Sequence, residues 1–196
     1  MGLGVVRESG AVAKFEDPRI SKLRQIIKEQ SLLTGTFTLS SGRESNYLFQ
    51  LRQTTLHPGG IALIGELVVE FMGAHGLRCI AGLELGAVPI VSAAAQASFG
   101  RYPIGAFFVR KRAKAHGAQE RVDGYIKGYG EFLVVDDVTT TGNSMLDAIE
   151  AIRDEGYPIR VTKALSIVDR EEGAAANLAS HGIDLFSLIK RSDFGL

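Results

Sequence analysis

Two adjacent carboxylates and a run of hydroxyl residues form the most chemically distinctive stretch of the sequence. Asp136 and Asp137 follow four apolar residues, and "VTTTGNS" comes next, before an apolar-periodic segment begins. An apolar strand, a polar loop and a helix start in this order favour an anion site, because free backbone N–H groups and the helix dipole attract negative charge. Carboxylates placed one turn earlier can accept hydrogen bonds from neutral hydroxyls or hold a metal. A sugar phosphate meets both demands.

The full string "VVDDVTTTGNS" is more specific than its parts. A bare pair of aspartates after a strand also occurs in metal-dependent ATPases and phospho-acceptor domains, and an ordinary strand end can use Asp and Thr to cap a helix. The complete string resembles the phosphoribosyl pyrophosphate signature of the type I phosphoribosyltransferases. The resemblance implies their α/β fold, a parallel β-sheet flanked by helices with a small N-terminal hood.

A strongly basic segment precedes this stretch. Five basic residues lie within seven positions: Arg110, Lys111, Arg112, Lys114 and His116. The segment has no apolar face and glycines follow it, so a mobile loop is favoured over a buried helix. A charge run is usually just a solvated face. Beside a phosphoribosyl pyrophosphate site, however, cations stabilise the departing pyrophosphate, a closing loop excludes water, and a histidine can donate a proton to the leaving group.

With both segments considered, the chain resembles the orotate phosphoribosyltransferases. The pattern "RKxxKxHG" is similar to that family's catalytic loop, and it falls here on Arg110, Lys111, Lys114, His116 and Gly117. "FTLSSGRESNYLFQLRQT" resembles the base-binding hood, and "SIVDREEG" resembles the segment that carries the orotate-contacting arginine, here Arg170. The resemblance extends from about residue 20 to about residue 190 in the expected order.

The resemblance implies a reaction and a role for each matching residue. Such enzymes use Mg²⁺ to join orotate to the ribose of phosphoribosyl pyrophosphate, giving orotidine 5′-monophosphate and pyrophosphate for UMP biosynthesis. The catalytic set is then Lys114, His116, Asp137 and Asp136, with Lys114 the leading candidate. The sugar donor is bound by Arg110, Lys111, Lys114, His116, Asp136, Asp137, Val138, Thr139, Thr140, Thr141, Gly142, Asn143 and Ser144. Orotate is bound by Leu48, Phe49, Thr140 and Arg170, whose planar fork matches a carboxylate.

The resemblance also implies the cofactor and the assembly. No side chain is expected to bind Mg²⁺ directly, because the ion is held mainly through the substrate. The basic loop serves the partner's site in this family, so a homodimer is expected, with Arg110 reaching the pyrophosphate of the neighbouring subunit.

Two positions depart from the family pattern and keep other readings open. Many relatives carry a lysine where this chain has Ser40, and some carry one where it has Gly86. The alternatives are a phosphoribosyltransferase for another base and a non-catalytic regulator that binds phosphoribosyl pyrophosphate. Arg170 disfavours the first alternative, since an apolar or amide-reading site has no use for it. The intact loop cations and a net charge of zero disfavour the second.

The elements that must position these residues follow from periodicity. A helix is predicted over 17–33, strands around a turn over 35–54, and a helix over 59–76. Strands are then predicted over 78–83, 103–109, 131–137, 160–169 and 184–189, with helices over 87–99, 144–156 and 171–182 and a polar segment over 110–130. Continuous apolar strands separated by helices indicate a parallel sheet that is covered on both faces. We expect a single domain over 1–196, with the hood at about 17–56 and the sugar-donor core at about 59–190, and a loose or locally docked arm over 1–16.

Composition bounds the class of protein. The chain has 196 residues, of which 45% are hydrophobic, and 22 basic side chains balance 22 acidic ones, so neither a nucleic-acid nor a membrane partner is indicated. Cys79 is the single cysteine, which excludes an internal disulfide. No apolar run approaches the roughly 20 residues of a membrane span, and the N-terminus lacks a signal-peptide pattern. A cytoplasmic protein is expected.

Overall fold

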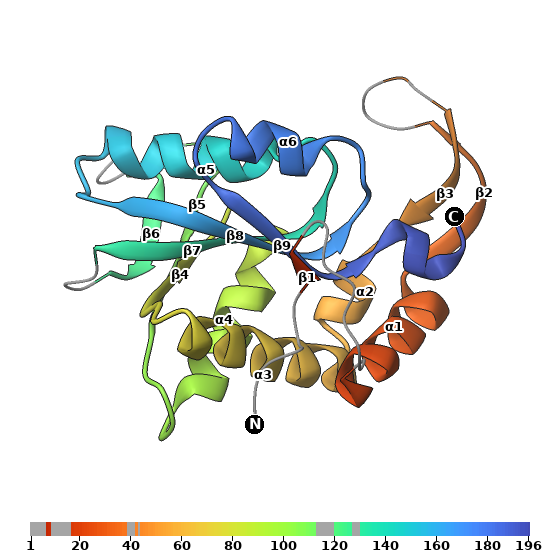
Figure 1. The fold of residues 1–196 in the computed structure, drawn as a ribbon, viewed down its shortest axis with the longest axis horizontal. Coiled ribbons are helices and arrows are strands. Elements are labelled where there is room, and N and C mark those ends of the chain that lie inside the picture. The colour runs from red at the N-terminus through yellow and green to blue at the C-terminus, as the bar shows by residue number, and fades with distance from the viewer. Residues whose placement is uncertain (1–6, 9–16, 39–41, 43, 113–119, 127–129) are drawn as a thin grey trace.

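A mostly parallel seven-stranded sheet forms the centre of the protein (Figure 1). The computed structural model describes residues 7–8, 17–38, 42, 44–112, 120–126 and 130–196. The strand order is β1-β9-β8-β7-β4-β5-β6. The strands are β1 (Arg7–Glu8), β4 (Cys79–Ala81), β5 (Gly105–Val109), β6 (Val122–Tyr125), β7 (Glu131–Thr139), β8 (Arg160–Asp169) and β9 (Asp184–Lys190). The predicted α/β class, with a parallel sheet flanked by helices, is confirmed.

The inner strands are parallel because helical connections carry the chain back across the sheet. Val134 of β7 pairs with Ala81 of β4 on one side and with Ala164 of β8 on the other. These residues are buried, as expected for strands covered on both faces. The two edge strands, β1 and β6, instead pair antiparallel with β9 and β5.

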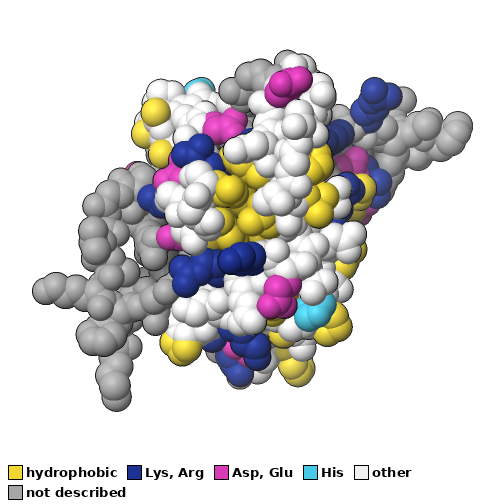
Figure 2. Space-filling view, turned by 90° about the vertical axis from the view of Figure 1, so that its right-hand side faces the viewer, with side chains coloured by type: hydrophobic (Ala, Val, Ile, Leu, Met, Phe, Trp, Pro, Cys, Tyr) yellow, Lys and Arg dark blue, Asp and Glu magenta, His cyan; other side chains and the backbone are white. Residues whose placement is uncertain are grey.

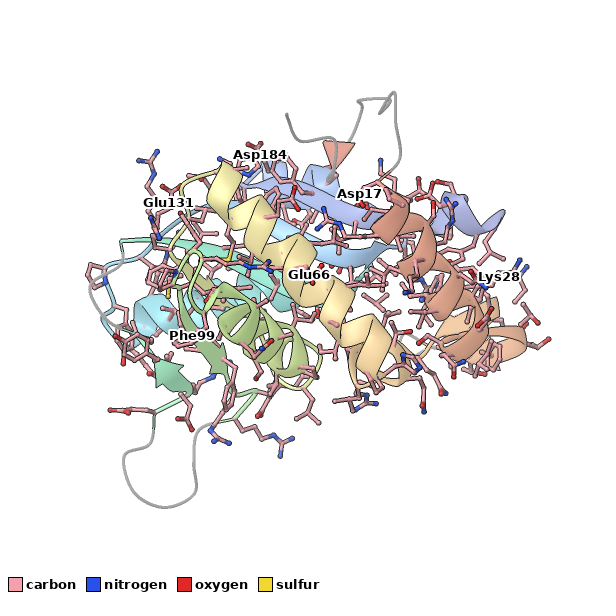
Figure 3. The ribbon with its side chains drawn as sticks, turned by 90° about the horizontal axis from the view of Figure 1, so that it is seen from below. Asp17, Lys28, Glu66, Phe99, Glu131 and Asp184 are labelled. Carbon is pink, nitrogen blue, oxygen red and sulfur yellow. The ribbon has the colours of Figure 1, made fainter. Side chains whose placement is uncertain are left out.

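Helices cover both faces of the sheet. α3 (Pro58–Ala74) and α4 (Ala87–Ser98) lie on one face with α1 (Pro18–Gln30) beside α3, as Figure 3 shows from below. α5 (Asn143–Asp154) and α6 (Ala174–Ala179) lie on the other face (Figure 1). Within these described ranges no helix has both the length and the apolar character that crossing a membrane requires.

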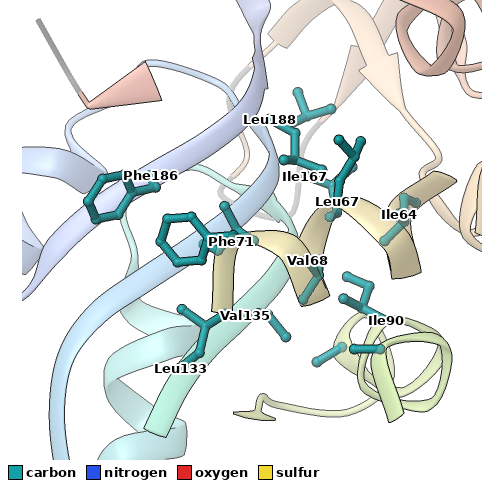
Figure 4. Packing of buried hydrophobic residues seen from close by; sticks show 14 of the residues in the cluster. Ile64, Leu67, Val68, Phe71, Ile90, Leu133, Val135, Ile167, Phe186 and Leu188 are labelled. Atoms are coloured by element: carbon teal, nitrogen blue, oxygen red, sulfur yellow. The ribbon is translucent and has the colours of Figure 1, made fainter. Parts of the chain in front are cut away.

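Each face of the sheet has its own apolar core. On the α3 face, the ring centroid of Phe71 lies 5.0 Å from that of Phe186 on β9, and Figure 4 shows aliphatic side chains of the sheet and of α4 around them. On the α5 face, Phe107 and Phe132 meet edge to face with their centroids 5.3 Å apart. Packing on both sides fixes the central strands, whose ends carry the polar residues of interest.

A separate antiparallel hairpin forms the hood. β2 (Leu32–Thr38) pairs with β3 (Glu44–Phe49), and the short helix α2 (Arg52–Thr55) follows. The prediction that the first helix continues to residue 33 was wrong. Its last helical residue is Gln30, and the buried Ser31 Oγ lies 2.7 Å from Thr54 Oγ1, so the chain turns there into β2. The strand predicted to reach residue 54 also ends early, at Phe49.

Two further expectations need correction. The segment 110–130 is not a polar loop throughout, because residues 122–125 form β6 against β5. The helix predicted over 171–182 occupies only Ala174–Ala179, because Glu171 (φ 58°) and Gly173 (φ 100°) adopt left-handed backbone conformations before it. The chain then closes with a 3₁₀ turn, η1 (Arg191–Phe194), that was not predicted.

Candidate active site

A pocket of ≈ 880 Å³ opens at the carboxyl ends of β4 and β7. Four segments line it: 48–53 from the end of β3 into α2, 83–86 before α4, Lys111, and 136–138 together with Ser144. Figure 2 views the end of the molecule that carries the hood in Figure 1, where apolar side chains gather near the centre with basic side chains beside them. The position is the one where open α/β sheets bind ligands, since the loops after the strands converge there.

Asp136 and Asp137 lie together in this pocket, as the sequence predicts. Asp136 Oδ1 accepts from the backbone N–H of Asp137 at 3.0 Å, and Asp137 Oδ1 accepts from that of Val138 at 2.9 Å. Burial and the like charge of Asp137 raise the pKa of Asp136 well above the ordinary value of an aspartate, and the positive charge of Lys111 opposes this rise. The positive charge near the two carboxylates therefore does not balance their negative charge, and the pair is suited to bind neutral hydroxyl donors or a cation.

The loop after β7 leads into a helix start that no side chain caps. Asp17 and His57 accept hydrogen bonds from first-turn N–H groups of α1 and α3, whereas α5 has no such side-chain bond. Gly142 takes φ 80° at this N-cap, a conformation that glycine adopts without strain. The first N–H groups of α5 consequently remain available to an anion.

Other residues of the predicted sugar-donor loop differ in exposure. Thr139 is buried, its Oγ1 has no hydrogen-bond partner among the described residues, and its carbonyl accepts from the Arg170 N–H. Thr141 and Asn143 are exposed, and the Asn177 side-chain amide of α6 donates to both, at 2.7 and 3.0 Å. Ser144 and Val138 line the pocket, whereas Thr140 does not appear in its wall. The loop is thus braced from α6 and faces the pocket at its two ends.

A second strand–glycine–helix connection, before α4, forms the part of the wall next to Asp137. An ideal Cβ at Gly86 would stand 2.7 Å from Asp137 Cγ, closer than real side chains approach. A Cβ at Gly82 would overlap the Val135 carbonyl oxygen and the Ala87 Cβ. With Asp137 in this position, Gly86 has no room for the lysine of some relatives. Ser40, the other departure, lies outside the described residues.

The basic loop is described only at its beginning. Lys111 lines the pocket, and its backbone N–H donates to Glu84 Oε1 at 2.9 Å. Arg110 points to β6, where its Nη2 lies 2.7 Å from Asp123 Oδ2, and it does not line the pocket. Lys114 and His116, the principal predicted catalytic residues of this loop, lie outside the described residues.

The predicted base-binding residues come from the hood and from the end of β8. Leu48 and Phe49 line the pocket. Arg170 is 6% exposed and is not among the residues that line the pocket. Its Nη2 contacts Tyr47 Oη on β3 at 3.2 Å and Glu172 Oε1 at 2.8 Å. Its buried Nε has no hydrogen-bond partner among the described residues. Arg170 is therefore not the surface arginine that two neighbouring glutamates alone would suggest.

Sequence reasoning missed part of the pocket wall. Gln50, Arg52 and Gln53 line it from α2 and the turn before it, and Glu84 and Leu85 line it before α4. A four-residue helix is too short to show a period. For the second segment a signal was present, since the apolar strand, glycine and helix start of "CIAGLELGAVPI" repeat the order found around Asp137. Within the described ranges, no three His, Cys, Asp or Glu side chains are grouped so that they could hold a metal.

No family model matches the chain, but individual relatives place it in a family. The orotate phosphoribosyltransferase of Rhodopseudomonas palustris (strain BisB5) is 44% identical over 179 residues, covering 89% of this chain and 95% of the relative.

Solved structures agree with this relative. The Mycobacterium tuberculosis H37Rv orotate phosphoribosyltransferase in complex with Fe(III) dicitrate has a TM-score of 0.79 and 41% identity, covering 91% of this chain and all of that one. A structure of the same enzyme in complex with 5-phospho-α-D-ribosyl 1-diphosphate has a TM-score of 0.76 and 37% identity, covering 91% of this chain and again all of the other. By its sequence, its sheet and the pocket at the end of that sheet, the chain belongs to the orotate phosphoribosyltransferases.

Proposed function

We propose that the pocket at the ends of β4 and β7 is where this chain carries out the orotate phosphoribosyltransferase reaction. The reaction transfers the 5-phosphoribosyl group of phosphoribosyl pyrophosphate to orotate, giving orotidine 5′-monophosphate and pyrophosphate for UMP biosynthesis. One observation carries the placement: Asp136 and Asp137 lie in a wall that also contains Ser144, from the uncapped first turn of α5. The carboxylates that can accept from sugar hydroxyls and the N–H groups that can donate to a phosphate thus lie at the two ends of one short loop.

In this proposal the β7–α5 connection holds the ribose 5-phosphate. Asp136 and Asp137 accept hydrogen bonds from the ring hydroxyls, and the 5′-phosphate binds the segment from Thr139 to Ser144. Bond cleavage at the anomeric carbon leaves positive charge on the sugar ring, and a fixed carboxylate near that ring stabilises the charge without having to reorganise. Asp137, held by the Val138 N–H and pressed against Gly86, is the carboxylate in a fixed position.

The leaving pyrophosphate and the base occupy the remaining walls. Lys111 is placed to meet the pyrophosphate, and Lys114 and His116 are assigned to it through the family's loop pattern, with Lys114 as the main catalytic group. Leu48 and Phe49 contact the flat base, and Arg170, helped by Thr140, receives its carboxylate. The unpartnered Nε of Arg170 supports this role, since a buried donor without a partner is costly unless a ligand satisfies it.

Mg²⁺ fits the residues present only as an ion shared with substrate. The two carboxylates are hard oxygen ligands of the kind Mg²⁺ prefers, but such sites usually complete their shell with substrate phosphates and water. When bound, the ion supplies positive charge to the pyrophosphate. The role of the chain is to leave Asp136 and Asp137 accessible in the pocket wall.

We further propose a homodimer in which the basic loop serves the partner's site, in the cytoplasm. In this assembly Arg110 exchanges its Asp123 contact for the partner's pyrophosphate. Mixing Lys114→Ala subunits with Asp137→Asn subunits tests the sharing, since hybrid dimers would contain one intact site. Partial recovery of activity is expected, and no recovery would count against a shared loop.

The activity itself is tested by following orotate absorbance with the purified chain, phosphoribosyl pyrophosphate and Mg²⁺. Consumption of orotate, with no pyrophosphate release when uracil or a purine replaces it, is the expected result. Turnover of another base instead would reassign the specificity. Binding of the sugar donor without turnover of any base, together with a gel shift on DNA, would indicate a regulator.

A further inference from the structure

The three residues after β8 form a short arm whose side chains point to different neighbours. Arg170 is enclosed by Tyr47 and Glu172: its guanidinium lies 4.9 Å from the Tyr47 ring centroid and its Nη2 is 2.8 Å from Glu172 Oε1. Between them, Glu171 adopts φ 58° and is the single non-glycine residue with positive φ among those described. A β-carbon disfavours this conformation, which persists only where surrounding contacts enforce it.

A local bond and contacts with the C-terminal turn hold this conformation, and the local bond runs from the Glu171 N–H to Asp169 Oδ1 at 2.8 Å. The Glu171 carboxylate accepts from the Ser192 backbone N–H at 2.9 Å and from Ser192 Oγ at 3.1 Å. Arg191 Nε stands 3.7 Å from the same carboxylate. The left-handed backbone therefore sends the Glu171 side chain to η1 while Arg170 stays directed at the hood.

The same turn also contacts the hood, so the contacts close into a ring. The Phe194 ring centroid lies 5.3 Å from that of Phe49, and Phe49 meets Tyr47 edge to face at 5.6 Å on β3. Figure 1 shows the C-terminus beside the two hood strands. The ring runs from Tyr47 to Arg170, through the arm to η1, and back through the aromatic residues to β3. It links both elements that are assigned to the base.

We propose that Glu171 and the C-terminal turn form a clamp that fixes the orientation of Arg170, which makes Glu171 a positioning residue for base recognition. The inference rests on the proposed function, in which Arg170 receives the carboxylate of the base. Recognition of a carboxylate by both N–H groups of the fork requires the guanidinium plane to be held in one orientation. Without the Glu171 link the arm can leave its left-handed conformation. Part of the binding free energy of the base is then used to order the arm, so the base binds more weakly.

Glu171→Gly separates this role from a structural one. Glycine accepts the positive φ without strain, so the variant loses the carboxylate but keeps the backbone path. The KM for orotate should rise about 10-fold, as for loss of hydrogen bonds to a charged group, while the Kd of phosphoribosyl pyrophosphate stays at the parent value. A purely structural role of the carboxylate predicts a lower Tm with parental values of the KM and the Kd, and a parental KM for orotate would overturn the clamp.

Two matched variants sharpen the comparison. Glu171→Ala loses the same carboxylate but keeps the unfavourable φ, so it should show the same rise in KM together with a lower Tm than Glu171→Gly. Ser192→Ala removes one of the two hydrogen bonds from Ser192 and leaves the backbone one, so its KM should lie between the parent and Glu171→Gly. A Ser192→Ala effect as large as that of Glu171→Gly would contradict the geometry.

Failure of the clamp and failure of the proposed function give different results. If Arg170→Ala leaves the KM for orotate unchanged, the assignment of Arg170 itself is wrong. If Arg170→Ala raises the KM and Glu171→Gly does not, the clamp alone is wrong. With both proposals right, adding Glu171→Gly to Arg170→Ala changes the KM no further, because the two residues act through one contact.

Discussion

Gly86→Ala tests whether the close approach of α4 to Asp137 sets the geometry of the site. The added Cβ would stand 2.7 Å from Asp137 Cγ, whereas carbon atoms in ordinary contact are about 3.5–4.0 Å apart. The Asp137 carboxylate must then move by about 1 Å, and movement of that size in a catalytic constellation can cost roughly 100-fold in rate. Moving it also strains the 2.9 Å bond from the Val138 N–H.

The assay combines kcat for orotate consumption with thermal unfolding. We expect kcat to fall about 100-fold, with stability reduced by about 1–3 kcal/mol, as for overpacking of a filled site. Gly73→Ala is the matched control, because Gly73 lies in α3, where an added Cβ meets nothing within 4 Å. The control should keep its kcat and gain about 0.5–1 kcal/mol in helix stability. Reasoning from this contact is refuted if Gly86→Ala keeps kcat within twofold of the parent.

Three other predictions concern Asp136, Cys79 and Lys114. Asp136→Asn should abolish most activity yet raise Tm relative to the parent, and the gain in Tm should grow from pH 4 to pH 8. Because the pKa of Asp136 is raised on folding, its ionised form destabilises the fold; this cost is absent below the pKa of the unfolded state and complete above that of the folded state. A Tm difference that does not change with pH would contradict this. Cys79, buried with its pKa raised to about 12, should resist iodoacetamide at pH 8 until urea unfolds the chain, and rapid labelling of native protein would argue against its burial. Lys114→Ala should lower turnover far more than affinity for the sugar donor, and equal kinetics in variant and parent would remove the loop from the mechanism.

The parallel core was predictable because its signals are local. Four apolar residues before Asp136 mark a buried strand, and the threonine–glycine loop marks the helix start after it, so the β7–α5 connection followed from neighbouring residues alone. β6 was missed because its residues alternate weakly and lie on a sheet edge, where only the antiparallel pairing with β5, from Val122–Val109 to Tyr125–Ala106, makes them a strand.

Contacts between segments that are distant in the chain could not be predicted from sequence patterns. The Glu171 side chain meets Ser192, 21 positions later, and a glutamate gives no local sign of this contact or of its left-handed backbone. The tight fit of Gly86 against Asp137 depends likewise on two strands lying side by side. Arg110 was assigned to a neighbouring pyrophosphate on its motif alone, and its ion pair with Asp123 becomes visible only once β5 and β6 form a hairpin.

Both borders of the seven-stranded sheet are closed by brief antiparallel strands. Two N-terminal residues shield the outer side of β9, and at the other border β6 spans only four residues with Gly124 at φ 136°. Short, twisted borders offer few unpaired backbone groups in register, which discourages continuation of a sheet from one molecule into the next. The homodimer proposed above would therefore rely on side-chain contacts, and its formation would carry little risk of fibre growth.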